Sequence, residues 1–329
     1  MKIKARSFLW AAAALLAGLI AYTGLAYRRD IAAAEARVAQ GSLLAETPCG
    51  PIEYAVIGTG APVLVVHGAG GGFDQGLEFG RPLAERGFSV IAMSRFGYLR
   101  TPLPADASPA AQGDAHACLL DALKLPAAAI LGGSAGVPSA IEFCLRHEKR
   151  CAAMALLVPA LFPSRPAAPP RIPPGAPASS LFGWIVGSDF FFWLNTRLAR
   201  NLLLERLFAT PVRDFQSAAP EERERILRVM RIALPVSRRR AGLWNDIGIV
   251  TSPAPHALER ISVPAIVFAV EDDLFGTYRA SRAMAARIPG ARFVGFPTGG
   301  HLWVGRQREL VSELDAFLRA SPGAPRRDP

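Results

Sequence analysis

Short apolar runs recur along most of the chain, and each is followed by a segment with helical character. Apolar runs of this length are typical of strands buried on both faces, as in parallel sheets that helices cover on both sides. The alternation therefore predicts an α/β fold with a mostly parallel central sheet flanked by helices. The expected strands cover 51–58, 62–68, 88–94, 127–133, 152–159, 263–273 and 291–297. The expected helices cover 76–87, 109–124, 135–148, 277–288 and 303–319.

The alternation stops near residue 160 and resumes near residue 261, which predicts one domain with an insertion rather than two domains in tandem. The insertion begins with 163–178, which is so rich in proline that helix and central strand are excluded. Helical, aromatic and basic segments follow. The expected parts are a Pro-rich linker and helical cap at 161–260, an α/β core made of 48–160 and 261–321, and a disordered tail at 322–329.

An uncharged stretch, residues 8–27, lies between two basic flanks near the start of the chain. As a helix rising ~1.5 Å per residue, it is long enough to cross a hydrocarbon layer of about 30 Å. Residues 1–29 are therefore expected to be a membrane anchor or a signal segment, followed by a helical stem at 30–47. An uncleaved anchor is favoured over a cleaved signal ending at the small residues 24–26, and over a soluble helix.

The orientation of this anchor is left open by the basic residues on both of its flanks. A single short N-terminal anchor usually leaves the catalytic domain outside the cytoplasm. The expected location is therefore the membrane, with the catalytic domain on the periplasmic side.

The formal net charge of +10 is concentrated in arginines at 223–231 and 237–240. The sequence has no nucleic-acid-binding motif and no basic helix with interleaved aromatic residues, so a nucleic-acid partner is not expected. The arginines are expected on a solvated face or against anionic lipid headgroups.

Four cysteines, Cys49, Cys118, Cys144 and Cys151, form neither a C-x-x-C pair nor a zinc-ligand spacing. They are expected to be small apolar core residues, and no metal site is predicted. An oxidising compartment would allow one disulfide, whose pairing the sequence leaves open.

A G-x-S-x-G motif, residues 132–136, falls where an expected strand passes into an expected helix. Glycine and serine also occur in ordinary turns, so the motif gains its meaning from this position. A sharp strand–turn–helix places a serine hydroxyl above the edge of the sheet, where it can act as a nucleophile. The motif therefore makes Ser134 the candidate nucleophile.

A serine nucleophile needs a base, usually a histidine that a carboxylate orients. Of the five histidines, His301 alone follows the last expected strand in a loop at the same edge of the sheet as Ser134. The carboxylate is expected in a loop after a strand, between serine and histidine in chain order. The strand at 263–273 ends in acidic residues, of which Asp273 is favoured and Asp272 is the alternative.

The order Ser134, Asp273, His301, with His67 and Gly68 near the front, resembles the α/β-hydrolase superfamily. The resemblance covers about residues 50–320 and implies a helical cap inserted after the sixth strand. It also implies an oxyanion hole formed by the backbone N–H groups of Ala69 or Gly70 and of Ala135. The chain departs from the family in two places: Val270 stands where a glycine is common, and Gly133 where a histidine is frequent.

The glycine-rich stretch at 68–76 has a second interpretation as a dinucleotide-binding turn, with Ser94 and Arg95 suited to NADP. Against it, Phe73 stands where the third glycine of G-x-G-x-x-G belongs, and the chain has no Y-x-x-x-K of a short-chain reductase. The stretch also lacks the G-K-[ST] ending of a P-loop. The oxyanion interpretation is therefore favoured, and no cofactor is expected.

These residues predict a serine hydrolase that cleaves a carboxylester, lactone or thioester through an acyl-enzyme. Two tryptophans and four phenylalanines at 180–198 predict either a helix packed on the sheet or an apolar lid over an acyl pocket. With the anchor, they favour a lipophilic small-molecule substrate. Carbon–carbon bond hydrolysis and aminopeptidase activity remain alternatives on the same fold, as do an NADP-dependent reductase and a non-catalytic binding module. The oligomeric state is not predicted.

Overall fold

The computed structural model describes residues 2–160, 183, 187–251 and 255–321. The described strands form one eight-stranded sheet in the order β1-β2-β4-β3-β5-β6-β7-β8. β1 and β2 run antiparallel to their neighbours, and the strands from β4 to β8 in this order pair in parallel. The strands are β1 (Leu43–Ala45), β2 (Ile52–Ile57), β3 (Ala61–Val66), β4 (Phe88–Met93), β5 (Ala128–Gly133), β6 (Cys151–Leu157), β7 (Ala265–Val270) and β8 (Arg292–Phe296). The predicted α/β fold with a mostly parallel sheet is confirmed.

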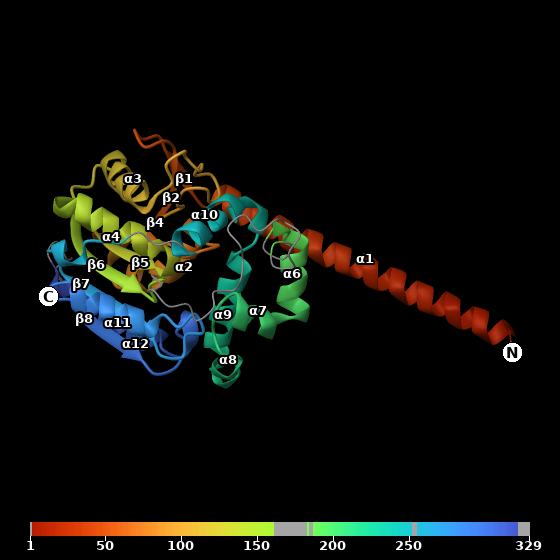
Figure 1. Cartoon of the computed structure of the whole chain (residues 1–329). Coiled ribbons are helices and arrows are strands. Elements are labelled where there is room, and N and C mark those ends of the chain that lie inside the picture. Colours follow the sequence, from red (N-terminus) through yellow and green to blue (C-terminus); the bar gives the residue numbers. More distant parts are fainter. Residues whose placement is uncertain (1, 161–182, 184–186, 252–254, 322–329) are drawn as a thin grey trace.

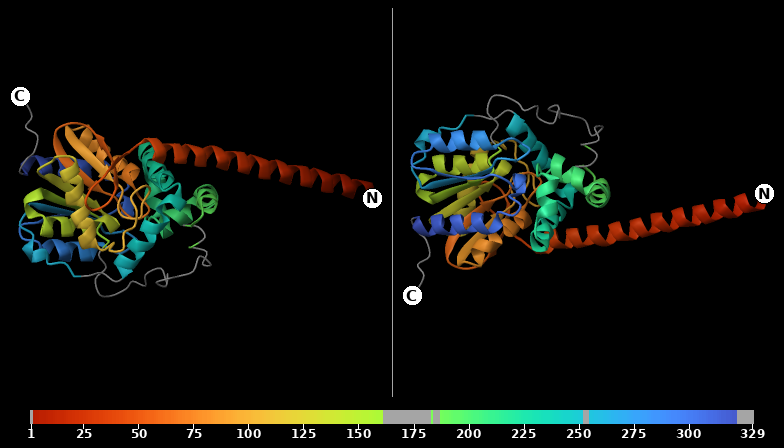
Figure 2. Two further views of the ribbon diagram at one scale, coloured as in Figure 1. Left: turned by 90° about the horizontal axis from the view of Figure 1, so that it is seen from above. Right: turned by 90° about the horizontal axis from the view of Figure 1, so that it is seen from below.

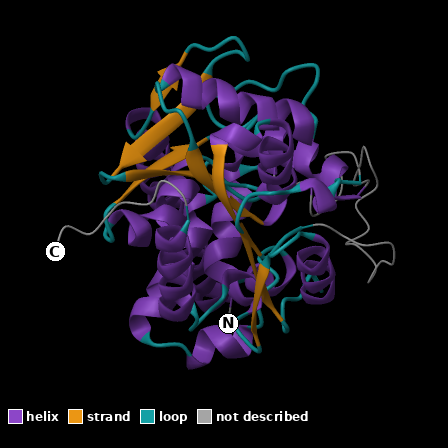
Figure 3. Ribbon diagram, turned by 90° about the vertical axis from the view of Figure 1, so that its left-hand side faces the viewer, coloured by secondary structure: helices purple, strands orange, loops and turns teal. Residues whose placement is uncertain are grey.

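Two apolar layers cover the sheet, because successive strand residues point to opposite faces. Leu64 and Val66 of β3 pack on the face that α3, α4 and α11 cover, whereas Val63 and Val65 pack on the face that α2 and α12 cover. Figure 3 shows the twisted sheet with helices on both sides. The covering helices are α2 (Phe73–Ala84), α3 (Pro109–Ala122), α4 (Val137–Arg146), α11 (Tyr278–Arg287) and α12 (Gln307–Ala320).

The insertion between β6 and β7 forms a helical cap, as the sequence predicts. Its described helices are α6 (Asp189–Leu198), α7 (Arg200–Arg206), α8 (Val212–Ser217), α9 (Pro220–Ile232), the 3₁₀ turn η3 (Val236–Arg239) and α10 (Arg240–Thr251). They gather on the side of the domain from which the N-terminal helix projects (Figures 1 and 2). The proline-rich segment at 163–178 and the tail at 322–329 lie outside the described residues.

A single long helix, α1 (Lys2–Gln40), joins the apolar N-terminal stretch to the domain. Its part from Leu9 to Gln40 is long and apolar enough to cross a membrane, a property that an anchor and a signal sequence share. The apolar half extends away from the domain (Figure 1). The helix expected over 30–47 ends at Gln40, because the next residues leave it to form β1 on β2.

All four cysteines are paired in two disulfides, where one was expected at most, and Cys144 and Cys151 lie in the apolar core as expected. One disulfide joins Cys49, after β1, to Cys118 on α3, and the other joins Cys144 on α4 to Cys151 at the start of β6. The first pair lies 69 residues apart in sequence. Its pairing depends on how the chain segment after β1 packs on α3, which no local spacing reveals.

Candidate active site

Ser134 occupies a strained turn between β5 and α4. Its backbone has φ 48°, a left-handed conformation that residues other than glycine rarely adopt. The turn is also tight, since a Cβ atom on Gly136 would lie 2.6 Å from the carbonyl oxygen of His67. Strain of this kind at a strand–turn–helix junction is typical of a nucleophile elbow.

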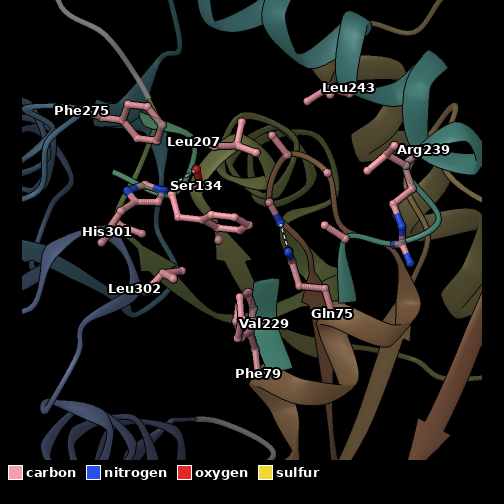
Figure 4. Close-up of a pocket in the computed structure, with 18 of the residues that line it drawn as sticks. Gln75, Phe79, Ser134, Leu207, Val229, Arg239, Leu243, Phe275, His301 and Leu302 are labelled. Atoms are coloured by element: carbon pink, nitrogen blue, oxygen red, sulfur yellow. Dashed lines mark hydrogen bonds between the residues drawn. The ribbon is translucent and has the colours of Figure 1, made fainter. Parts of the chain in front are cut away.

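His301 lies between Ser134 and Asp273 and is within hydrogen-bonding distance of both (Figure 4 shows the His301 and Ser134 side chains). Its Nε2 is 2.9 Å from the Ser134 Oγ, and its Nδ1 is 2.8 Å from an Asp273 carboxylate oxygen. Asp273 is 4% exposed and accepts two further hydrogen bonds, from the Phe275 backbone N–H at 2.9 Å and the Thr277 hydroxyl at 2.6 Å. The three predicted residues therefore come together, and Thr277, which the sequence did not single out, fixes the carboxylate.

Asp272, the alternative acid, takes another position. One of its carboxylate oxygens accepts a hydrogen bond from the Gly300 backbone N–H at 2.8 Å, and the other lies 3.2 Å from Arg213. Burial raises the pKa of Asp272, but these donors and Asp214 outweigh it, so the pKa lies below its usual value. Asp272 thus holds the loop that carries His301 without contacting the imidazole.

The two candidates for the first oxyanion donor, the N–H groups of Ala69 and Gly70 in the glycine-rich loop after β3, differ in their hydrogen bonds. The N–H of Gly70 donates to the Tyr98 hydroxyl at 3.2 Å, whereas the N–H of Ala69 has no acceptor among the described residues. Gln75 supports the loop by accepting a hydrogen bond from the Gly68 N–H at 2.9 Å (Figure 4). Ala135 belongs to the 3₁₀ turn that precedes α4, where leading N–H groups lack helical partners.

A buried polar network links this loop to the cap. The Tyr98 hydroxyl donates to Asp246 of α10, and Asp246 forms two hydrogen bonds of 2.6 Å with the Arg95 guanidinium. Arg95 in turn donates to the carbonyl oxygen of His67 at 2.9 Å. Burial, together with Asp246, raises the pKa of Tyr98 well above its usual range, so the phenol stays protonated. Because Arg95 is 4% exposed and fully paired, it is not placed to bind an NADP phosphate.

A cavity of about 130 Å³ opens beside Ser134 and His301, and its walls are mostly apolar. The cap contributes much of the wall, including Phe192 from the aromatic segment predicted as a lid. The described helix of that segment, α6, packs against α1 and against other parts of the cap. The large apolar lining residues are Phe79, Phe192, Leu207, Phe208, Val229, Leu243, Phe275, Leu302 and Trp303.

Two arginines of the predicted basic clusters are buried and depart from the expectation that these clusters are solvated or face lipid, whereas Arg228, Arg231, Arg238 and Arg240 are exposed. Arg225 is 7% exposed, pairs with Glu222 at 2.7 Å and donates to the carbonyl oxygen of Leu302 at 2.8 Å. Arg239 is 1% exposed, pairs with Asp74 at 2.7 Å and reaches the cavity wall opposite Ser134 (Figure 4). Each guanidinium can be buried because it donates hydrogen bonds to an acceptor far away in the sequence, Leu302 for Arg225 and Asp74 for Arg239.

A serine, a histidine and a carboxylate in series, at the carboxyl edge of a mostly parallel sheet and beneath a helical cap, are typical of the α/β-hydrolases. The chain belongs to this family: the family model for the alpha/beta hydrolase fold matches residues 61–304. The protein is therefore a hydrolase of the α/β fold.

Several known proteins are similar to this chain. An alpha/beta hydrolase fold protein from Nakamurella multipartita is 26% identical with a TM-score of 0.65, the match covering 85% of this chain and 99% of that one. An esterase, EaEST, from Exiguobacterium antarcticum is 18% identical with a TM-score of 0.61, over 84% and 99% of the two chains, and shows the fold alone. The uncharacterized hydrolase YcgS of Bacillus subtilis is 38% identical over 102 residues, which are 31% of this chain and 35% of that protein. The match thus spans about a third of that curated relative.

Replacing Asp246 by alanine is expected to lower the free energy of unfolding by about 3–5 kcal/mol, because Arg95 would stay buried without its counter-ion. Chemical denaturation in detergent measures the change. Asp121→Ala is the matched control, since Asp121 forms an ion pair with Arg150 but its side chain is 63% exposed, so the loss should be below about 1 kcal/mol. Equal losses in the two variants would contradict the prediction.

Proposed function

We propose that the protein is a serine hydrolase that cleaves an ester-like bond of a lipophilic small molecule through an acyl-enzyme. The observation that carries the proposal is the position of the His301 imidazole, within 2.9 Å of the Ser134 hydroxyl and 2.8 Å of the Asp273 carboxylate. The proposed nucleophile, base and orienting acid are thereby in hydrogen-bond contact.

In this mechanism His301 takes the proton of Ser134 as the hydroxyl oxygen attacks the substrate carbonyl carbon. Asp273 keeps the proton of the imidazole on Nδ1 and stabilises the imidazolium that forms. The N–H groups of Ala69 and Ala135 stabilise the oxyanion, a contribution of ~3 kcal/mol for each donor. His301 then protonates the leaving group and activates the water molecule that releases the acyl group from Ser134.

The cavity supports an apolar acyl group as the substrate portion that the protein binds. Its described lining contains no aspartate or glutamate, and its arginine, Arg239, is already paired with Asp74. An aminopeptidase needs a carboxylate to bind the free amino group of its substrate, so this alternative is disfavoured. A carboxylester, lactone or thioester fits the lining, and carbon–carbon bond hydrolysis remains the second candidate.

Attachment to a membrane, with the catalytic domain outside the cytoplasm, is part of the proposal. The apolar half of α1 supports attachment, and two disulfides suit an oxidising compartment. Helix α6 of the cap lies on the side of the domain that faces this apolar half of α1 (Figures 1 and 2). A bilayer around α1 would therefore be next to the cap, which forms part of the wall of the apolar cavity.

Labelling with a fluorophosphonate probe tests the catalytic proposal. The detergent-solubilised wild-type chain should label. Ser134→Ala should not label, because it lacks the attacking oxygen, and His301→Ala should label at least about 10³-fold more slowly, because it lacks the base. Circular dichroism checks that each variant is folded. A folded wild-type chain that does not label would refute the proposal.

The two neighbouring acids should differ in their effect. Asp273→Asn is expected to lower kcat by about 10⁴-fold, because an amide stabilises the wrong imidazole tautomer. Asp272→Asn keeps an oxygen that can accept the hydrogen bond from the Gly300 N–H, so it should change kcat by less than about tenfold. Hydrolysis of p-nitrophenyl esters of increasing chain length measures both. A larger loss in Asp272→Asn would reverse the assignment of the acid.

The location is tested by fractionating cells that produce the full chain. The protein should stay with the membranes after an alkaline wash, because the apolar half of α1 remains in the bilayer. Its cysteines should react with a maleimide only after reduction, since all four are paired. Release by alkali would contradict the anchor, and free thiols before reduction would contradict the compartment.

A further inference from the structure

The C-terminal part of α1 is packed into the catalytic domain. Ala34 and Val38 are 3% and 6% exposed, and Ala34 belongs to the same apolar cluster as Phe192 and Trp193 of α6. Asp30 accepts a hydrogen bond of 2.9 Å from the indole N–H of Trp193. This part of the helix is therefore bound to the cap along several turns and is not a free stem.

Arg37 extends these contacts from the cap to the core. Its Nε donates to an oxygen of Asp74 at 3.1 Å, while its Nη2 donates to the backbone carbonyl oxygens of Ile232, at 3.3 Å, and Leu234. Ile232 and Leu234 lie at the end of α9, just before the turn that carries Arg239. One side chain of α1 thus bridges the first turn of α2 and the segment of the cap that leads to Arg239.

Asp74 connects this bridge to the glycine-rich loop. Arg239 donates to both oxygens of Asp74, at 3.0 and 2.7 Å, and also to the carbonyl oxygen of Gly71. Gly71 lies two residues after Ala69, the candidate oxyanion donor. Asp74 also precedes Gln75, which accepts the hydrogen bond from the Gly68 N–H. The carboxylate that Arg37 contacts is therefore part of the support of the loop.

Arg37 is the second arginine that stabilises the negative charge of the buried Asp74 carboxylate. Burial raises the pKa of Asp74, but Arg239 and Arg37 outweigh burial, so the pKa lies below its usual value. The carboxylate is 5% exposed and shared by two guanidinium groups, each of which also donates to a backbone carbonyl. Without Arg37, the carboxylate would keep Arg239 on η3, which also reaches the carbonyl oxygen of Leu234 at 3.4 Å, but it would lose its tie to α1.

We propose that Arg37 is a positioning residue which, through Asp74 and Arg239, holds the glycine-rich loop in the conformation that the reaction needs. The membrane-anchor helix then contributes to catalysis as well as to attachment. The inference rests on the proposed serine-hydrolase function, because it assigns to the loop the stabilisation of an oxyanion. Arg37 lies outside the lining of the cavity, so its effect should fall on the chemical step and not on substrate binding.

The test compares Arg37→Ala, Arg37→Lys and Arg238→Ala in the full chain, solubilised in detergent. Arg238 is the matched control, because it also pairs with α1, at 3.3 Å from Glu35, but has no contact with Asp74. Arg37→Ala should slow fluorophosphonate labelling and lower kcat by about tenfold, with KM within about twofold of wild type, as expected for a small displacement of a catalytic group. Arg37→Lys should recover part of the loss, and Arg238→Ala should match the wild type.

All rates are measured at a temperature at which each variant is fully folded, and amide hydrogen exchange of residues 68–76 is followed in parallel. The amide hydrogens of this loop should exchange faster in Arg37→Ala than in Arg238→Ala. This measurement needs no substrate. If the wild-type chain labels and Arg37→Ala labels at the same rate, the proposed function stands, while the inference about Arg37 is wrong. Equal losses in Arg37→Ala and Arg238→Ala would also overturn it, since general packing of α1 would then explain both. A wild-type chain that fails to label would overturn the proposed function itself.

Discussion

The strained backbone of Ser134 is the constraint on which the rest of the site depends. A serine at φ 48° persists only if its surroundings hold it, and here β5 on one side and α4 on the other do so. The close approach of Gly136 to the carbonyl oxygen of His67 brings the start of α4 against the end of β3. The same packing places the glycine-rich loop beside the hydroxyl, because that loop begins where β3 ends. One tight turn therefore positions both the proposed nucleophile and the loop proposed to bind the oxyanion.

Buried ion pairs make the cap a fixed part of this arrangement. Arg95 pairs with Asp246, and Arg239 pairs with Asp74, so two core segments around the glycine-rich loop are tied to α10 and η3. Replacing a buried pair by apolar residues often costs little, but separating its partners costs several kcal/mol. Movement of the cap as a rigid lid would expose or separate these charges. Opening of the cavity is therefore expected to involve side chains or short segments rather than the whole cap.

How far the sequence predicts this structure depends on the range of the interactions concerned. The strands other than β1, the position of Ser134 and the loop of His301 follow from local patterns, because parallel strands end at one edge of the sheet and bring their loops together. The pairing of Cys49 with Cys118, the burial of Arg225 and Arg239, and the contact of Tyr98 with Gly70 depend on partners far away in sequence. A run of arginines looks like a solvated surface until the acceptors that meet it are known. The role of Thr277 was missed for a different reason: its partner Asp273 is only four residues away, but a threonine after a strand carries no signal of its own.

The position of α1 gives the proposed function a geometric consequence. A helix that spans a bilayer tilts and rotates within it, and its flanking residues set how the attached domain meets the surface. The C-terminal part of α1 packs against α6 and the segment that follows α9, and Phe192 of α6 and Val229 of α9 line the apolar cavity. A lipophilic substrate dissolved in the bilayer would therefore reach the protein next to the cap and close to the cavity. In the proposed arrangement, membrane attachment would give the enzyme access to its substrate, and the contacts of Arg37 would link the proposed anchor to the glycine-rich loop.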